Sequence, residues 1–287
     1  MRWSKSKKIW IFVCIVVSVI ALMLVLLPNI LHWLGLHPTY KGESISATGR
    51  RALIITTSNG NLGEDGPATG VYGSELTIPY YVFENAGMAV DIASIDGGKI
   101  PIEPMSVRYP FVTADDRRAQ KDAIFQKKVS DSIFLSHVSV DRYDLIYIAG
   151  GWGAAYDLGQ SIMLGQKITE ANERGIILGS VCHGALGFLQ AKETDGRPLV
   201  EGKRMTAVTD KQLKELNITQ LPLHPEAELR NAGALYESSA AFRDVFATYV
   251  VVAGHIVTGQ NQNSSAETAH RMLMLLMDTN TTLIHPQ

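Results

Sequence analysis

The chain has 287 residues and 46% of them are hydrophobic, so it can bury a sizeable core in one large domain or two small ones. Four cations, Arg2, Lys5, Lys7 and Lys8, precede the first apolar segment, and the remaining residues contain 22 Lys and Arg against 28 Asp and Glu, a net charge of −6. This acidic body argues against nucleic acid as a partner.

Residues 9–27, IWIFVCIVVSVIALMLVLL, form an uncharged run of 19 residues that is long enough to cross a bilayer as a helix. A cleaved signal peptide is the alternative, but the run is longer than the usual hydrophobic region and no A-x-A-like cleavage site follows it. Four cations precede the run, and Lys41 is the only Lys or Arg in the fifteen residues after it. We therefore predict a single-pass signal anchor, with residues 1–8 in the cytoplasm and the folded domain on the extracytoplasmic side.

Residues 28–49 mix Pro, His, Gly and Ser without periodicity and indicate a tether. Four short apolar runs that end in turn residues then predict strands, and they are RALIITTSNG, MAVDIASIDGG, YDLIYIAGGWG and GIILGSVCHG. Helix-like stretches begin at Ser74, Gly159 and His183. Such alternation of strand and helix is typical of an α/β fold with a mainly parallel sheet that is covered on both faces.

The last part of the domain contains YVVVAGHIVTG, which predicts a hairpin that turns at Gly254 and His255. A final helix is expected from SSAETAHRMLMLLMD. We therefore predict one α/β domain over residues 50–278 and a tail over residues 279–287.

The domain holds a single cysteine, Cys182, because Cys14 lies in the apolar span, so no disulfide is available within it. The order small-x-Cys-x-Gly, from Ser180 to Gly184, follows a predicted strand and matches a nucleophile elbow. A helix that starts there would direct its free N–H groups at the sulfur and lower the pKa of the thiol. The alternative is a buried cysteine that fills the core.

The turn after the third predicted strand contains two glycines, Gly150 and Gly151. Parallel strands bring their carboxyl ends to one edge of a sheet, where ligands gather. The amides of these glycines could therefore form an oxyanion hole together with the N–H of His183.

Four segments, ATGVYGSELTIPYYVFENAGMAVDIAS, YDLIYIAGGWG, GSVCHGALGF and IVTGQNQNSSAETA, carry a family resemblance. In order and spacing they resemble the superfamily of the protease PfpI and the Parkinsonism-associated deglycase, and within it the branch of glyoxalase III and the HchA-type chaperone. The resemblance covers residues 50–278. It implies a flavodoxin-like, class I glutamine amidotransferase-like three-layer sandwich with a nucleophile at its elbow.

The resemblance also assigns roles to single residues. Cys182 matches the reactive cysteine of the family, and His183 matches the histidine that follows it. Glu75 stands four residues before Pro79 and matches the acid that hydrogen-bonds this cysteine. Its carboxyl group could donate a hydrogen bond in the protonated form or transfer protons as a general acid/base. Without the resemblance, an acid in the first turn of a helix, favoured there by the helix dipole, would explain Glu75.

The sequence departs from the branch at two positions. Leu213 stands where the branch usually places an acid that orients the histidine, so either Asp210 or Glu215 substitutes for this acid or the triad is incomplete. Trp152 stands in GGWG where branch members commonly have GGHG. A tryptophan cannot bind a metal or exchange a proton, but it could wall off an apolar pocket.

These observations favour a membrane-tethered cysteine enzyme that acts on small reactive carbonyls. It would convert methylglyoxal to lactate or remove glycation adducts from proteins, through a Cys182 thiolate and without a cofactor. The remaining histidines lack metal-ligand spacing, so no metal site is expected. The expected partners are the carbonyl substrate and the membrane, and a homodimer is left open.

A non-catalytic chaperone or redox-stress sensor with an oxidisable Cys182 is the alternative function, and Leu213 and Trp152 favour it. Peptidase activity like that of PfpI also stays open. A glutamine amidotransferase is disfavoured because the sequence shows no synthase domain beside the cysteine-containing one.

Overall fold

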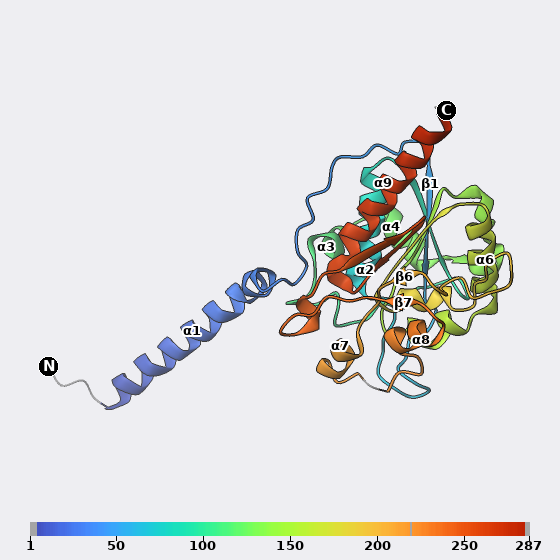
Figure 1. The fold of residues 1–287 in the computed structure, drawn as a ribbon. Helices are drawn as coiled ribbons and strands as arrows, with labels where there is room; N and C mark the ends of the chain where they lie inside the picture. Colours follow the sequence, from blue (N-terminus) through green and yellow to red (C-terminus); the bar gives the residue numbers. More distant parts are fainter. Residues whose placement is uncertain (1–4, 219, 285–287) are drawn as a thin grey trace.

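The computed structural model describes residues 5–218 and 220–284, and its centre is a sheet of seven described strands in the order β3-β2-β1-β4-β5-β9-β8 (Figure 1). Neighbouring strands are parallel except β8 and β9. A second, small sheet pairs β6 with β7. The strands are β1 (Arg51–Thr56), β2 (Ala89–Ser94), β3 (Ile133–Phe134), β4 (Leu145–Ile148), β5 (Ile177–Val181), β6 (Arg204–Met205), β7 (Leu235–Tyr236), β8 (Val250–Ala253) and β9 (Ile256–Gly259).

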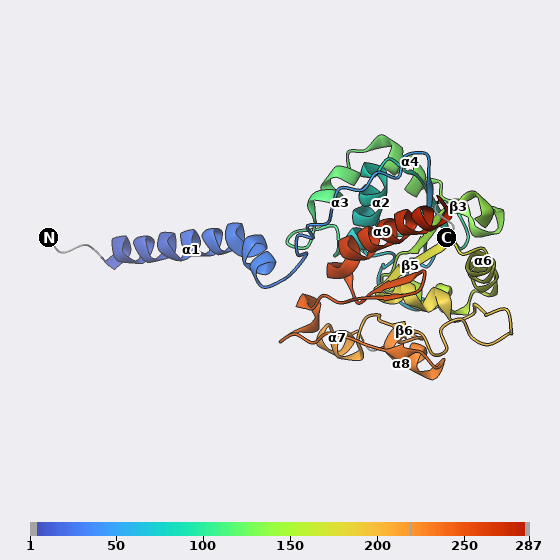
Figure 2. The ribbon, with the colours of Figure 1, turned by 45° about the horizontal axis from the view of Figure 1, so that its top comes forward.

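Helices cover both faces of the sheet (Figure 2). Along β1, Ala52 and Ile54 join one buried cluster while Leu53 and Ile55 join another, because successive strand side chains point to opposite faces. The predicted mainly parallel three-layer sandwich is confirmed. The α-helices of the domain are α2 (Gly73–Asn85), α3 (Ala114–Ala119), α4 (Ala123–Ser130), α5 (Ala154–Asp157), α6 (Ile162–Glu173), α7 (Asp210–Glu215), α8 (Pro225–Asn231) and α9 (Ser265–Ile284).

Short 3₁₀-helices fill the connections. They are η1 (Leu135–His137), η2 (Val140–Arg142), η3 (Leu158–Gln160), η4 (Cys182–Phe188), η5 (Asp244–Phe246) and η6 (Gln262–Ser264). We expected a helix from His183, and the structure forms the 3₁₀-helix η4 there. Glycine weakens an α-helix, and Gly184 packs so tightly on β4 that an added Cβ would lie 2.2 Å from the Ile148 carbonyl oxygen.

The apolar N-terminal segment forms α1 (Lys5–Trp33), which contains Pro28 and projects away from the domain (Figure 1). Among the described residues it is the one helix that is long and apolar enough to cross a membrane. The helix continues past Leu27, where we expected the span to end. Residues 1–4 of the predicted basic segment lie outside the described residues.

The segment after α1 packs against the domain. Leu36 and Ala47 are buried, and the Ala47 N–H donates to the Ala86 carbonyl oxygen at 2.7 Å. The part of the expected tether that follows α1 therefore runs along the domain surface. At the other end, α9 continues to Ile284, into the predicted tail, and residues 285–287 lie outside the described residues.

Candidate active site

Cys182 sits at a sharp turn between β5 and η4. Its φ of +56° places a non-glycine residue in the left-handed region, at a cost of about 1 kcal/mol. The turn is held by Gly184, which packs on the end of the neighbouring strand β4. The side chain is 6% exposed. The geometry is that of an elbow, as predicted, but the thiol lies inside a pocket and not at the surface.

Gly150 and Gly151 follow β4 and bring its backbone close to the elbow. A Cβ on Gly150 would lie 2.6 Å from Glu75 Oε2 and 2.8 Å from the His183 nitrogen, so only glycine fits. Gly151 has a φ of +107°, which glycine adopts without strain. The N–H groups of Gly151 and His183 face the Cys182 sulfur, whereas the Gly150 amide faces the Glu75 carboxyl group.

Glu75 lies in the first turn of α2 with its carboxyl group beside the Cys182 thiol. The side chain is 1% exposed. Burial raises the pKa of this carboxyl group to about 8, and the contacts with Cys182 and the Gly150 amide oppose this rise without reversing it. Glu75 is thus both the first-turn acid of a helix and a neighbour of the thiol, and it can exchange a proton near neutral pH.

The pKa of the Cys182 thiol is raised well above its ordinary value. Burial is the main cause, and the negative charge of Glu75 adds to it. The amides of His183 and Gly151 act in the opposite direction but do not outweigh these effects. Our expectation of a lowered thiol pKa is therefore wrong for the resting protein. The thiol and the carboxyl group titrate as a coupled pair that holds at most one negative charge near neutral pH.

His183 is fully buried, and its Nδ1 lies 3.3 Å from the Cys182 sulfur. Burial lowers the pKa of the imidazole to about 3, so the ring is neutral at physiological pH. Its Nε2 is buried and has no hydrogen-bond partner in the part of the chain that the structure describes.

Neither candidate for a third member reaches this histidine. Asp210 Oδ1 lies 3.6 Å from His224 Nδ1, and Glu215 Oε2 accepts from the Asp244 N–H at 2.8 Å. Leu213 is buried and lines the pocket. Of the two alternatives, the geometry supports an incomplete triad, because the helix that carries Asp210 and Glu215 points an aliphatic side chain at the pocket.

The cysteine opens into a pocket of about 120 Å³, the volume of about four water molecules. Trp152 lines it, in agreement with the apolar wall that we expected from this residue. The other apolar residues that line the pocket are Met105, Phe111, Val208, Leu213, Leu216 and Val245. The polar residues that line it include Tyr72, Glu75, Gln212 and Gln262. Sequence reasoning missed Met105, Phe111 and Val245, because no motif marks them. Met105 and Phe111 lie in an irregular segment, and Val245 lies in η5.

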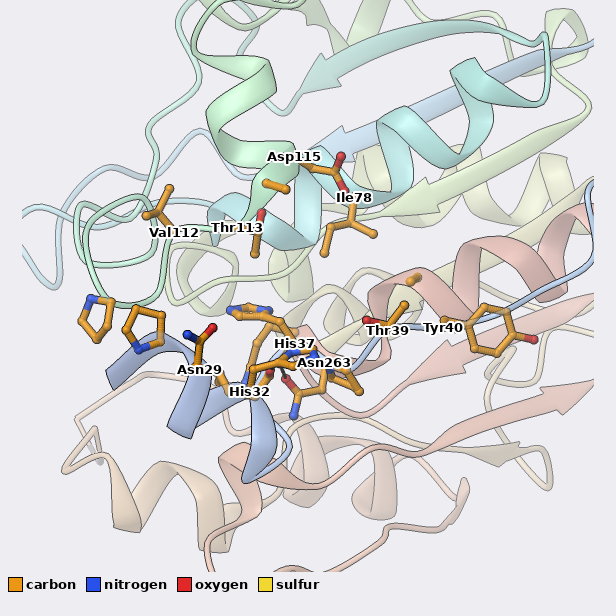
Figure 3. A pocket seen from close by; sticks show the side chains of 17 residues that line it. Asn29, His32, His37, Thr39, Tyr40, Ile78, Val112, Thr113, Asp115 and Asn263 are labelled. Atoms are coloured by element: carbon orange, nitrogen blue, oxygen red, sulfur yellow. Dashed lines mark hydrogen bonds between the residues drawn. The ribbon is translucent and has the colours of Figure 1, made fainter. Parts of the chain in front are cut away.

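A larger cavity of about 500 Å³ lies between the end of α1 and the domain (Figure 3). Asn29, His32, His37 and Asp115 are among the residues that line it. Burial lowers the pKa of His37 to about 4 and raises that of Asp115. This cavity holds no thiol, and the described residues include no group of three His, Cys, Asp or Glu placed to bind a metal. We therefore assign the active site to the smaller, cysteine-containing pocket.

Comparison with known proteins places this geometry in context. A Schizosaccharomyces pombe protein named "probable glutathione-independent glyoxalase" is 31% identical, over 79% of this chain and 98% of its own length. A glutathione-independent glyoxalase of Saccharomyces cerevisiae is 30% identical, over 77% of this chain and 95% of its own.

Solved structures share the fold. The Francisella tularensis Rapid Encystment Protein 24 KDa superposes with a TM-score of 0.74 at 29% identity, over 79% of this chain and 99% of its own. Glyoxalase III of Candida albicans gives a TM-score of 0.72 at 25% identity. The match covers 79% of this chain and 97% of the Candida chain. The DJ-1/PfpI family profile matches residues 68–274. The chain therefore belongs to the DJ-1/PfpI family.

Proposed function

We propose that this protein is a membrane-anchored, cofactor-independent glyoxalase that converts methylglyoxal to lactate. The observation that carries the proposal is the pairing of a buried thiol with a buried carboxyl group, faced by two backbone amides, at the end of a small apolar pocket. The relatives named as glutathione-independent glyoxalases support it, because each is matched over nearly its whole length. The pocket of about 120 Å³ suits a free three-carbon dicarbonyl better than a sugar adduct on a protein.

The reaction begins when the Cys182 thiol passes its proton to the neighbouring Glu75 carboxylate and adds to the aldehyde carbon of methylglyoxal. This proton then moves from Glu75 to the oxygen of the adduct, which leaves Glu75 ionised again. The amides of His183 and Gly151, which face the sulfur, hold the oxyanion of the resulting hemithioacetal. Glu75, with a pKa of about 8, accepts the proton from the aldehyde carbon and returns it to the neighbouring ketone carbon. Water then hydrolyses the thioester, which releases lactate and restores the thiol. The overall reaction converts methylglyoxal and water to lactate.

Membrane anchoring by α1 is the second part of the proposal. Its apolar side chains are exposed along the helix, and a helix of this length and hydropathy can cross a bilayer. Two relatives are matched over 98% and 95% of their length by 79% and 77% of this chain, so about a fifth of the chain lies outside these matches. The cations before the apolar run orient the domain to the extracytoplasmic side.

The burial of Cys182 weighs against the alternative of a redox sensor. Sensor cysteines are accessible and have a low pKa, whereas this thiol is 6% exposed and its pKa is raised.

The test is lactate formation from methylglyoxal by the full-length protein in detergent micelles, beside Cys182→Ser. We expect a loss of at least about 10³-fold in kcat/KM, because a serine hydroxyl is barely ionised. The melting temperature of the same two preparations serves as the control and should change little. Equal turnover by both proteins would show that Cys182 has no catalytic role, and absence of lactate from the wild-type protein would refute the proposed reaction.

A further inference from the structure

Two segments of the domain touch the end of α1. The Tyr109 hydroxyl donates to the carbonyl oxygen of Leu24, inside the apolar run. Gly35, just after the helix, packs on Phe246, and a Cβ there would lie 3.1 Å from the Phe246 carbonyl oxygen. The loop around Tyr109 and the segment around Phe246 therefore flank the point where α1 meets the domain.

These contacts set the depth of the domain relative to a bilayer. Leu24 lies three residues, about 4.5 Å along a helix, before Leu27, where the most apolar run ends, and α1 itself continues to Trp33. Tyr109 is 52% exposed, and tyrosine is one of the two residue types that gather at membrane surfaces. Phe242, which stacks on Phe246 at 5.0 Å, is 69% exposed, and Trp33 at the end of α1 is 83% exposed. We call Trp33, Tyr109 and Phe242 the aromatic rim.

The same segments line the cysteine pocket. Met105 and Phe111 lie on either side of Tyr109 in the chain and both contact the pocket, and Val245 directly precedes Phe246 and does the same. Gln262 lines both this pocket and the cavity between α1 and the domain that Figure 3 shows. The pocket therefore lies beside the segments that face the end of α1.

We propose that the aromatic rim rests in the surface of the bilayer and that the cysteine pocket receives 2-oxoaldehydes with alkyl chains from the membrane. The proposal deepens the glyoxalase function and rests on it. The dicarbonyl head occupies the small pocket, and the alkyl chain leaves past Met105, Phe111 and Val245 toward the lipid. The reaction is R–CO–CHO plus water to R–CH(OH)–COOH, by the same thiol addition, proton shift and hydrolysis. The product carboxylate is charged, so it partitions toward water.

The first test compares two substrates with the full-length protein in phosphatidylcholine vesicles. We expect the double variant Tyr109→Asp/Phe242→Asp to lower kcat/KM for 2-oxododecanal at least tenfold and to leave that for methylglyoxal unchanged. Phe134→Asp is the matched control, because Phe134 is also exposed but lies on the edge strand β3, away from α1 (Figure 2). An equal loss with both aldehydes, or no loss with either, would overturn the proposal.

The second test measures the docking without any activity. Tyr109→Trp in vesicles with brominated acyl chains should lose more fluorescence than Phe134→Trp does, each relative to the wild-type protein. Equal quenching of the two variants would overturn the membrane position of the rim. If the wild-type protein acts on neither aldehyde, the glyoxalase function and the substrate class both fall, and quenching alone then decides whether the rim meets the bilayer.

Discussion

Two of the almost completely buried carboxyl groups in this domain, those of Asp244 and Glu75, ionise in opposite ways. Asp244 is 2% exposed and accepts hydrogen bonds from Lys211 Nζ at 2.5 Å and Thr209 Oγ1 at 2.8 Å. Burial would raise its pKa, but these bonds outweigh burial and lower it. Glu75, at 1% exposure, meets a thiol and an amide instead of a cation, and its pKa rises to about 8.

The contrast shows that the hydrogen-bond and charge partners of a buried acid, rather than its burial alone, decide its pKa and therefore its charge state. Paired with Lys211, Asp244 stays charged and ties η5 to the loop before α7. Glu75 is left close to neutrality, where it can both give and take a proton. A cation beside Glu75 would hold the carboxyl group in the charged form.

The largest effect is expected from Glu75→Gln on stability. The pKa of Glu75 in the fold, about 8, exceeds its ordinary value of 4.5, so between these pH values the folded state holds a proton that the unfolded state has released. Stability therefore falls as pH rises through this window. We expect Glu75→Gln to gain about 2–4 kcal/mol in the free energy of unfolding at pH 8.5 and almost nothing at pH 4.5.

Urea titration of the full-length protein in detergent, followed by near-ultraviolet circular dichroism, measures this difference. Glu84→Gln on the same helix is the control, since Glu84 is partly exposed and paired with Arg118. A gain that is the same at both pH values would show that the Glu75 carboxyl group is not held neutral by burial.

A change of opposite sign in the free energy of unfolding is expected when Asp244 is substituted. Asp244→Asn removes the nearer of the two charged partners of Lys211 and weakens the bond with Thr209, so it should cost about 2 kcal/mol at pH 7. Because the pKa of Asp244 is lowered in the fold, its stabilisation is present above the ordinary Asp value and is lost as pH falls below it. The cost should therefore shrink near pH 3 in the same urea titrations. Asp195→Asn, in an exposed pair with Arg197, should change nothing measurable.

The smallest effect is expected on the reactivity of the thiol. After burial, the charge of Glu75 is the next cause that raises the pKa of Cys182, so Glu75→Gln should lower the apparent pKa for alkylation by iodoacetamide. A Cys14→Ala background restricts the reaction to Cys182. Coincident pH profiles for Glu75→Gln and Glu84→Gln would rule out the contact between carboxyl group and thiol.

Much of the architecture is legible in the sequence because it depends on local patterns. The runs that contain β1, β2, β4 and β5 are apolar and end in turn residues, and the small residues around Cys182 allow the elbow at the end of β5. The hairpin of β8 and β9 turns at Gly254, with a φ of +63°, as its sequence predicts. These features need only residue periodicity and the conformational freedom of glycine.

The properties of the site depend on packing between distant segments, which no local pattern encodes. Cys182 meets the Glu75 carboxyl group because α2 and the end of β5 converge, and burial of the pair raises both pKa values. Whether Asp210 or Glu215 would reach His183 depended on the rotation of one short helix, which turns Leu213 inward instead. The sequence by itself therefore determined the α/β order and the position of the nucleophile. Only the tertiary structure decided the charge state and the partners of that nucleophile, because electrostatic energies depend on distance and solvent exposure, not on separation along the chain.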